Sequence, residues 1–129
     1  MTKVLFMMYR MIMADAMKQS LSGQFQMFVS KEYKNIVAAV LTFTPDITLV
    51  EIPESDAMHP EKYLQMCVEV RKEAPNCKLL LMCPEHNSES IKAVVDAMRS
   101  GKIDDYVFYD ASMEYLKSKL EVLSADHSN

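Results

Sequence analysis

Hydrophobic residues fall into two alternating kinds of segment along the chain. Short, nearly continuous apolar runs, such as 3–8 and 78–83, are typical of strands that are buried on both faces. Between these runs, apolar residues recur three and four positions apart, which is typical of amphipathic helices. The predicted strands are 3–8, 25–29, 47–52, 78–83 and 106–109. The predicted helices have their apolar faces within 13–21, 36–41, 63–68, 91–98 and 113–123.

The alternation of strands and helices predicts an α/β fold. Parallel strands need crossover connections, and the intervening helices supply them. We therefore expect a three-layer, doubly wound, five-stranded parallel sheet in the flavodoxin-like order 2-1-3-4-5. Residues 1–122 are predicted to form one domain. Residues 123–129 have no clear period and are predicted to form a flexible C-terminal tail or linker.

Composition and charge exclude several classes of protein. The chain has 129 residues and a net charge of -4, which disfavours a nucleic-acid-binding surface. No segment has the roughly 18 continuous apolar residues of a membrane helix. The odd number of cysteines without CxxC spacing, namely Cys67, Cys77 and Cys83, predicts reduced thiols in the cytoplasm. The histidines have no ligand spacing, so no metal site is expected.

Candidate functional residues lie at the predicted ends of the strands, which meet at one edge of a parallel sheet. These positions are Met8, Tyr9, Glu51, Cys83 and Tyr109. Glu51 is predicted to be a carboxylate exposed at the end of its strand. No lysine is predicted to face it, so we expect no positive charge beside it.

Two motifs resemble response-regulator receiver domains. PDITLVE (residues 45–51) resembles the third-strand signature, which typically reads PDLVLLD with the phosphorylated aspartate last. GKIDDYVFYD (residues 101–110) resembles the GADDYLxKP sequence around the fifth strand. The resemblance covers about residues 2–122 and makes the 1–122 domain receiver-like. It implies that Glu51 replaces the phosphoacceptor and that Tyr106 occupies the aromatic position that changes orientation on activation.

The same resemblance implies that the phosphorylation chemistry is lost. The metal-binding acidic pair falls on Met8 and Tyr9, which lack the hard oxygen ligands that Mg²⁺ needs. The hydroxyl residue falls on Cys83, a weak hydrogen-bond donor, and the lysine falls on Tyr109. We therefore expect a degenerate receiver (a pseudo-receiver) of two-component or phosphorelay type. It would be neither phosphorylated nor enzymatic, would need no cofactor, and would act by protein contact in the cytoplasm.

Alternatives remain open at this point. The chain could be a conventional receiver that is phosphorylated on Glu51, or on a displaced acid such as Glu54 or Asp56. It could also be a flavodoxin-like binder of a nucleotide or flavin, although the loop MMYRMIM lacks the Gly, Ser or Thr of a phosphate-binding loop. Tyr9 and Tyr109 could hydrogen-bond to Glu51, or they could pack their rings and expose their hydroxyls.

The resemblance also implies a contact surface. In receivers, partners or a second copy dock on the face formed by the fourth helix, fifth strand and fifth helix. The candidate interface residues on that face are Lys92, Asp96, Arg99 and Asp105. The expected partner is another protein or a second copy in a homodimer, with no direct binding of nucleic acid or membrane.

Overall fold

The computed structural model describes the backbone of residues 1–128 and the side chains of residues 1–125. The strands are β1 (Thr2–Met7), β2 (Phe25–Ser30), β3 (Ile47–Glu51), β4 (Lys78–Cys83) and β5 (Asp105–Phe108). The helices are α1 (Met11–Leu21), α2 (Ile36–Phe43), α3 (Glu61–Glu73), α4 (Ser88–Arg99) and α5 (Met113–Ser128). Two short 3₁₀ turns, η1 (Tyr33–Asn35) and η2 (Glu54–Asp56), lie in the loops that follow β2 and β3.

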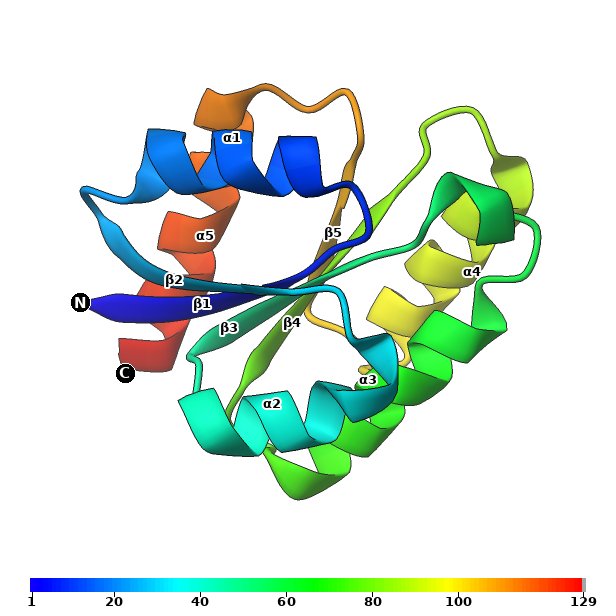
Figure 1. The fold of residues 1–129 in the computed structure, drawn as a ribbon. Helices are drawn as coiled ribbons and strands as arrows, with labels where there is room; N and C mark the ends of the chain where they lie inside the picture. The colour runs from blue at the N-terminus through cyan, green and yellow to red at the C-terminus, as the bar shows by residue number, and fades with distance from the viewer. Residues whose placement is uncertain (129) are drawn as a thin grey trace.

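The strands form one parallel sheet in the order β2-β1-β3-β4-β5, which confirms the predicted fold class. Helices α1 and α5 cover one face of the sheet, and α2, α3 and α4 cover the other (Figure 1). Successive side chains of a strand point to opposite faces. Leu5 and Met7 therefore pack in the core beneath α2–α4, whereas Val4 and Phe6 pack in the core beneath α1 and α5.

The central strands are buried because helices cover both faces of the sheet. All five residues of β3 are buried, including its final residue, Glu51. Helix α4 begins at an Asn87 cap, whose side-chain oxygen accepts a hydrogen bond from the Ser90 N–H at 3.0 Å. Gly101, with φ of +81°, follows the C-terminal end of α4 in the left-handed conformation that a helix-ending glycine favours.

The C-terminal segment is helical beyond the predicted domain boundary at residue 122. Helix α5 continues through Ser128, and Leu123 is buried against the core beneath α1. Leu123 extends the apolar stripe of Leu116 and Leu120, and the Ser124 hydroxyl forms a hydrogen bond with the Thr2 hydroxyl. These contacts explain why the helix does not end near residue 122. Asn129 lies outside the described residues, and a linker role for 123–129 stays a prediction.

Within residues 1–128, no helix is both long and apolar enough to cross a membrane.

Candidate functional site

Glu51 lies at the carboxyl edge, the edge of the sheet where the carboxyl ends of the strands meet. Its side chain is fully buried, so the prediction that it is exposed is wrong. The loop between β1 and α1 passes over it because β1 is the neighbour of β3 in the sheet. Glu51 Oε1 accepts hydrogen bonds from the backbone N–H groups of Tyr9, at 2.8 Å, and Arg10, at 3.0 Å.

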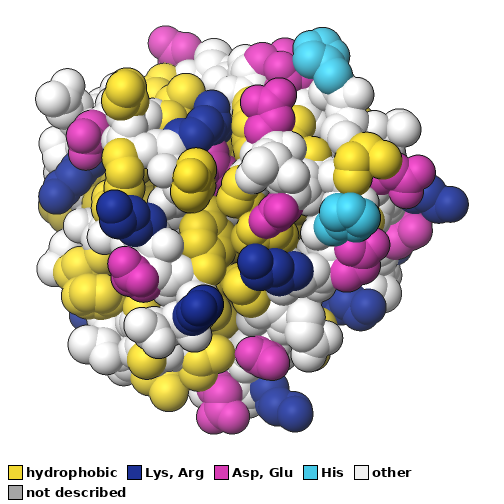
Figure 2. Space-filling model, turned by 45° about the vertical axis from the view of Figure 1, so that its right-hand side comes forward, with side chains coloured by type: hydrophobic (Ala, Val, Ile, Leu, Met, Phe, Trp, Pro, Cys, Tyr) yellow, Lys and Arg dark blue, Asp and Glu magenta, His cyan; other side chains and the backbone are white. Residues whose placement is uncertain are grey.

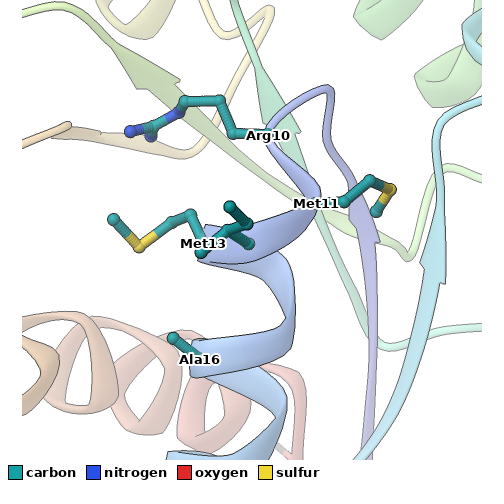
Figure 3. Close-up of a pocket in the computed structure, with 5 residues that line it drawn as sticks. Arg10, Met11, Met13 and Ala16 are labelled. Carbon is teal, nitrogen blue, oxygen red and sulfur yellow. The ribbon is translucent and has the colours of Figure 1, made fainter.

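Arg10 supplies a positive charge beside Glu51 that the sequence did not predict. Its Nε donates a hydrogen bond to Glu51 Oε2, forming an ion pair, and its side chain is about one third exposed, at 32%. The guanidinium carbon lies 3.8 Å from the centre of the Tyr109 ring, a cation–π geometry. In Figure 3 the Arg10 side chain extends from the start of α1 on the same side as Met13, and Met11 points the other way. The expectation that no cation faces Glu51 is therefore wrong.

The tyrosines around this ion pair bond to main-chain atoms. The Tyr109 hydroxyl donates to the backbone carbonyl of Ile52, and the Tyr33 hydroxyl donates to the backbone carbonyl of Glu51 at 2.8 Å. The Tyr9 side chain is 67% exposed, and only its backbone N–H contacts the carboxylate. Neither predicted tyrosine thus donates its hydroxyl to Glu51. Burial, together with the charge of Glu51, raises the pKa of Tyr33 and Tyr109, so both hydroxyls stay neutral.

Met8 and Cys83 lie on opposite faces of the sheet, and both are fully buried. Met8 packs in the core beneath α1 and α5, and Cys83 packs in the core beneath α2–α4. Burial raises the pKa of the Cys83 thiol to about 11, with a further contribution from Glu85. Both side chains are therefore packing residues, and Cys83 is a protonated thiol at neutral pH.

The residues at this edge do not fit the Mg²⁺ ion that receiver chemistry employs. Mg²⁺ needs hard oxygen ligands, and both oxygens of Glu51 are already bonded within the protein. A guanidinium also stands beside them. Across residues 1–125, no group of three or more His, Cys, Asp or Glu side chains is arranged to hold a metal ion. His86 is exposed and lies 3.6 Å from Glu85, His59 is exposed, and the His127 side chain is outside the described residues.

The remaining predicted residues lie on β5 and α4. Tyr106 is half-buried, and its ring meets the Phe108 ring edge-on with centroids 5.6 Å apart. Asp105 is paired internally: its carboxylate accepts a hydrogen bond from Lys119 Nζ of α5 at 2.7 Å. Lys92, Asp96 and Arg99 are exposed on α4. Three of the four candidate interface side chains are thus accessible, and Asp105 instead joins β5 to α5.

Arg10 could have been found from one signal in the sequence. It is the only charged residue between positions 4 and 14, and it follows directly after a buried strand. A charge in such an apolar segment requires a partner, and Glu51 is the charged residue at the end of the neighbouring strand.

An apolar pocket of about 450 Å³ lies at the start of α1. It is lined by Arg10, Met11, Ile12, Met13 and Ala16 (Figure 3).

Comparison with known proteins identifies the fold. No protein-family model matches the chain, and no curated protein matches it. A response regulator from Thermotoga maritima superposes with a TM-score of 0.78 at 16% identity, covering 95% of this chain and 96% of that one. NtrX from Brucella abortus gives 0.81 at 17% identity over 99% of this chain and 27% of that one. An orphan response regulator of H. pylori gives 0.76 at 15% identity over 95% of both chains. The fold is therefore that of response-regulator receiver domains.

Proposed function

We propose that the chain is a receiver-like signalling domain of two-component or phosphorelay type that is not phosphorylated at Glu51. It acts as a pseudo-receiver in the cytoplasm, by contact with other proteins and without catalysis of its own. The observation that carries the proposal is the commitment of both Glu51 oxygens to Arg10 and to the loop between β1 and α1.

The proposal follows from what phosphoryl transfer needs. A carboxylate must approach phosphorus in line, while a metal ion and a cation stabilise the charge that develops on the phosphoryl oxygens. Here the Arg10 guanidinium already pairs with the carboxylate, and both Glu51 oxygens are bonded within the protein. Phosphorylation of Glu51 would first have to break the ion pair with Arg10 and remove the carboxylate from two backbone N–H groups. The arrangement stabilises Glu51 in its unmodified form.

A protein partner, or a second copy of the chain, is proposed to contact the α4–β5–α5 face. Lys92, Asp96 and Arg99 offer exposed charges of both signs there, which suits recognition by complementary charges. On the face of the molecule that Figure 2 shows, basic and acidic side chains are interspersed with hydrophobic ones. That mixture favours a protein partner over nucleic acid.

Intact-mass spectrometry tests the absence of phosphorylation directly. The protein is incubated with acetyl phosphate and Mg²⁺, in parallel with the variant Glu51→Gln. We expect neither protein to gain the mass of a phosphoryl group. A gain that Glu51→Gln abolishes would overturn the proposal.

Displaced acids are tested in the same experiment. Glu54 is exposed, and the Asp56 carboxylate accepts a hydrogen bond from the Tyr63 hydroxyl. A mass gain that persists in Glu51→Gln would move the modification to one of these acids, and Glu54→Gln and Asp56→Asn would then identify it. That result would also overturn the pseudo-receiver proposal, because the domain would remain a phosphoacceptor.

A further inference from the structure

A second cavity opens at the carboxyl edge, next to the Arg10–Glu51 pair. Its volume is about 440 Å³, which lies within the range of roughly 300–1,000 Å³ that small-molecule sites occupy. Residues from the loops after β1, β2 and β3 line it together with the first turns of α3. In open α/β sheets, ligands bind outside the carboxyl ends of the strands where the connections diverge, and this cavity lies at such a position.

The rim of the cavity is basic, although the protein is acidic overall. Lys31, Lys34 and Lys62 all line it, and all are exposed. None of these lysines forms an ion pair with a carboxylate in the part of the chain whose side chains are described. Glu32 and Asp56 also line the cavity, and the Asp56 carboxylate accepts a hydrogen bond from the Tyr63 hydroxyl. The three lysines exceed the two carboxylates by one charge, and Lys62 Nζ also lies 5.6 Å from the centre of the Tyr63 ring. The rim therefore has a small positive excess, which suits an anion.

The interior of the cavity is aromatic. The rings of Tyr33 and Tyr63 meet edge-on, with centroids 5.5 Å apart, and their hydroxyls are already engaged by Glu51 and Asp56. Tyr9 also lines the cavity, and as a residue it is 67% exposed, so a ligand can reach its side chain. Exposed aromatic rings stack against flat heterocycles with little dependence on which base is presented.

We propose that this cavity binds a nucleoside phosphate. The base stacks on Tyr9, and the phosphate contacts the lysines on the rim, Lys31, Lys34 and Lys62. An inorganic anion would leave the tyrosine rings unused, and a free nucleoside would leave the lysines unpaired. The loop after β1 has no glycine that would let its backbone N–H groups surround a phosphate. The phosphate is therefore bound by the positive charges of the lysines, which lie in the loop after β2 and on α3.

The site is connected to the Arg10–Glu51 pair through two residues. Tyr9 lines the cavity, and its backbone N–H donates to Glu51 Oε1 at 2.8 Å. Tyr33 also lines the cavity, and its hydroxyl donates to the Glu51 carbonyl at 2.8 Å. A ligand that contacts Tyr9 therefore also contacts the loop that holds Arg10 beside Glu51. This proposal does not depend on whether Glu51 is phosphorylated, and its failure would leave the proposed function intact.

Titration of the ¹⁵N-labelled protein, followed by two-dimensional NMR, tests the site. The probes are AMP, GMP, adenosine and inorganic phosphate, each added separately. We expect AMP or GMP to shift the amide signals of Tyr9, of residues 31–34 and of residues 55–63, and to shift the Arg10 Nε–H signal. Adenosine and phosphate should each bind at least about tenfold more weakly than the nucleotide, because each lacks one half of the contacts.

Matched variants make the assignment specific. The double variant Lys31→Gln with Lys34→Gln should lose about tenfold or more in AMP affinity, and Tyr9→Ala should lose a similar factor. Lys92→Gln, which removes an exposed lysine on α4, is the control and should bind as the unmodified protein does. Absence of nucleotide binding at millimolar concentration would overturn the proposal. Equal binding of phosphate alone, or unchanged affinity in the double variant, would overturn it as well.

Discussion

Arg10 and Glu51 form the most consequential contact between single residues. An ionised carboxylate that is removed from water costs free energy unless it is paired and hydrogen-bonded. Glu51 has the Arg10 side chain on one oxygen and two backbone N–H groups on the other. Charge-assisted bonds of this kind are about twice as strong as neutral ones. These contacts therefore hold the buried carboxylate in place and fix the loop between β1 and α1.

Replacing Arg10 by methionine leaves that buried charge with no cation. We expect Arg10→Met to lower the free energy of unfolding by about 3 kcal/mol, the lower end of the range for breaking a buried pair, because Arg10 is partly exposed. Urea denaturation followed by circular dichroism measures the change.

A double-mutant cycle separates the ion pair from general loss of packing. Glu51→Gln removes the charge but keeps an oxygen that can accept from the Tyr9 and Arg10 N–H groups. The double variant, Arg10→Met with Glu51→Gln, should be more stable than the sum of the single changes predicts, by about 1–3 kcal/mol. Strict additivity would show that the pair contributes nothing of its own.

At the residue scale, the sequence predicted that Tyr9, Glu51 and Tyr109 lie at one edge of the sheet. It did not predict how their side chains are used, or that Met8 and Cys83 pack into cores on opposite faces. The positions of Tyr9, Glu51 and Tyr109 at one edge follow from strand ends and sheet topology. The burial of Glu51 and the direction of the Arg10 side chain depend on the path of the loop between β1 and α1. A loop has no regular spacing of hydrophobic residues from which its path could be predicted. The Tyr109 hydroxyl likewise donates to the backbone carbonyl of Ile52, a contact that no sequence pattern predicts.

At the scale of elements, the ends of the helices are set by a few special residues. Gly101 has φ of +81° after α4, whereas Gly23, in the turn after α1, has no positive φ. A Cβ would meet no atom within 4 Å at either position. The two glycines therefore differ in backbone conformation, while neither is crowded by a neighbour.

This difference in backbone conformation predicts different outcomes when each glycine is replaced by alanine. Gly101→Ala should lower the free energy of unfolding by about 1 kcal/mol, because an L-residue is strained in the left-handed region. Gly23→Ala is the matched control and should cause no loss, since alanine also restricts the unfolded chain. Thermal and urea unfolding of the two variants, measured in parallel, give the two changes in the free energy of unfolding. Equal destabilisation by both would contradict the conformational explanation.

The existence and order of the helices and strands could be predicted because their apolar residues recur at regular spacings along the sequence. Leu80 and its neighbours in β4 form a continuous apolar run, and Val94 and Ala97 lie on the buried side of α4. Boundaries were less exact where polar residues join an element: β5 begins at Asp105, one position before the prediction, and α5 continues beyond Leu123. In both cases a side-chain contact, to Lys119 or to Thr2, accompanies the extension.

At the scale of the whole molecule, burial of ionisable groups predicts a loss of stability at alkaline pH. Burial raises the pKa of the Cys67 thiol from its ordinary 9.0 to about 12 and that of Cys83 to about 11. Burial also raises the pKa of Tyr33 and Tyr109 above their ordinary 10.0. Above pH 9 the unfolded chain releases protons that the folded chain retains. The contribution of these groups to the free energy of unfolding should therefore be constant between pH 7 and pH 9 and fall as the pH rises above 9.

Urea midpoints measured between pH 7 and pH 10.5 check this expectation. The variant Cys67→Val removes one buried thiol, so its stability should fall less steeply between pH 9 and pH 10.5 than that of the unmodified protein. A profile that rises with pH, or identical slopes for both proteins, would show that the thiols do not control the transition.

The two ends of the described chain lie together, far from the carboxyl edge. Thr2 opens β1, Ser124 lies near the end of α5, and their hydroxyls form a hydrogen bond (Figure 1). In a parallel sheet the amino ends of the strands are on the opposite side from Glu51. Any fused sequence, whether a fluorescent reporter or an affinity tag, would thus project from the opposite pole. Information from the Arg10 loop would have to cross the full length of the strands, or travel along α5, before it reached such an attachment.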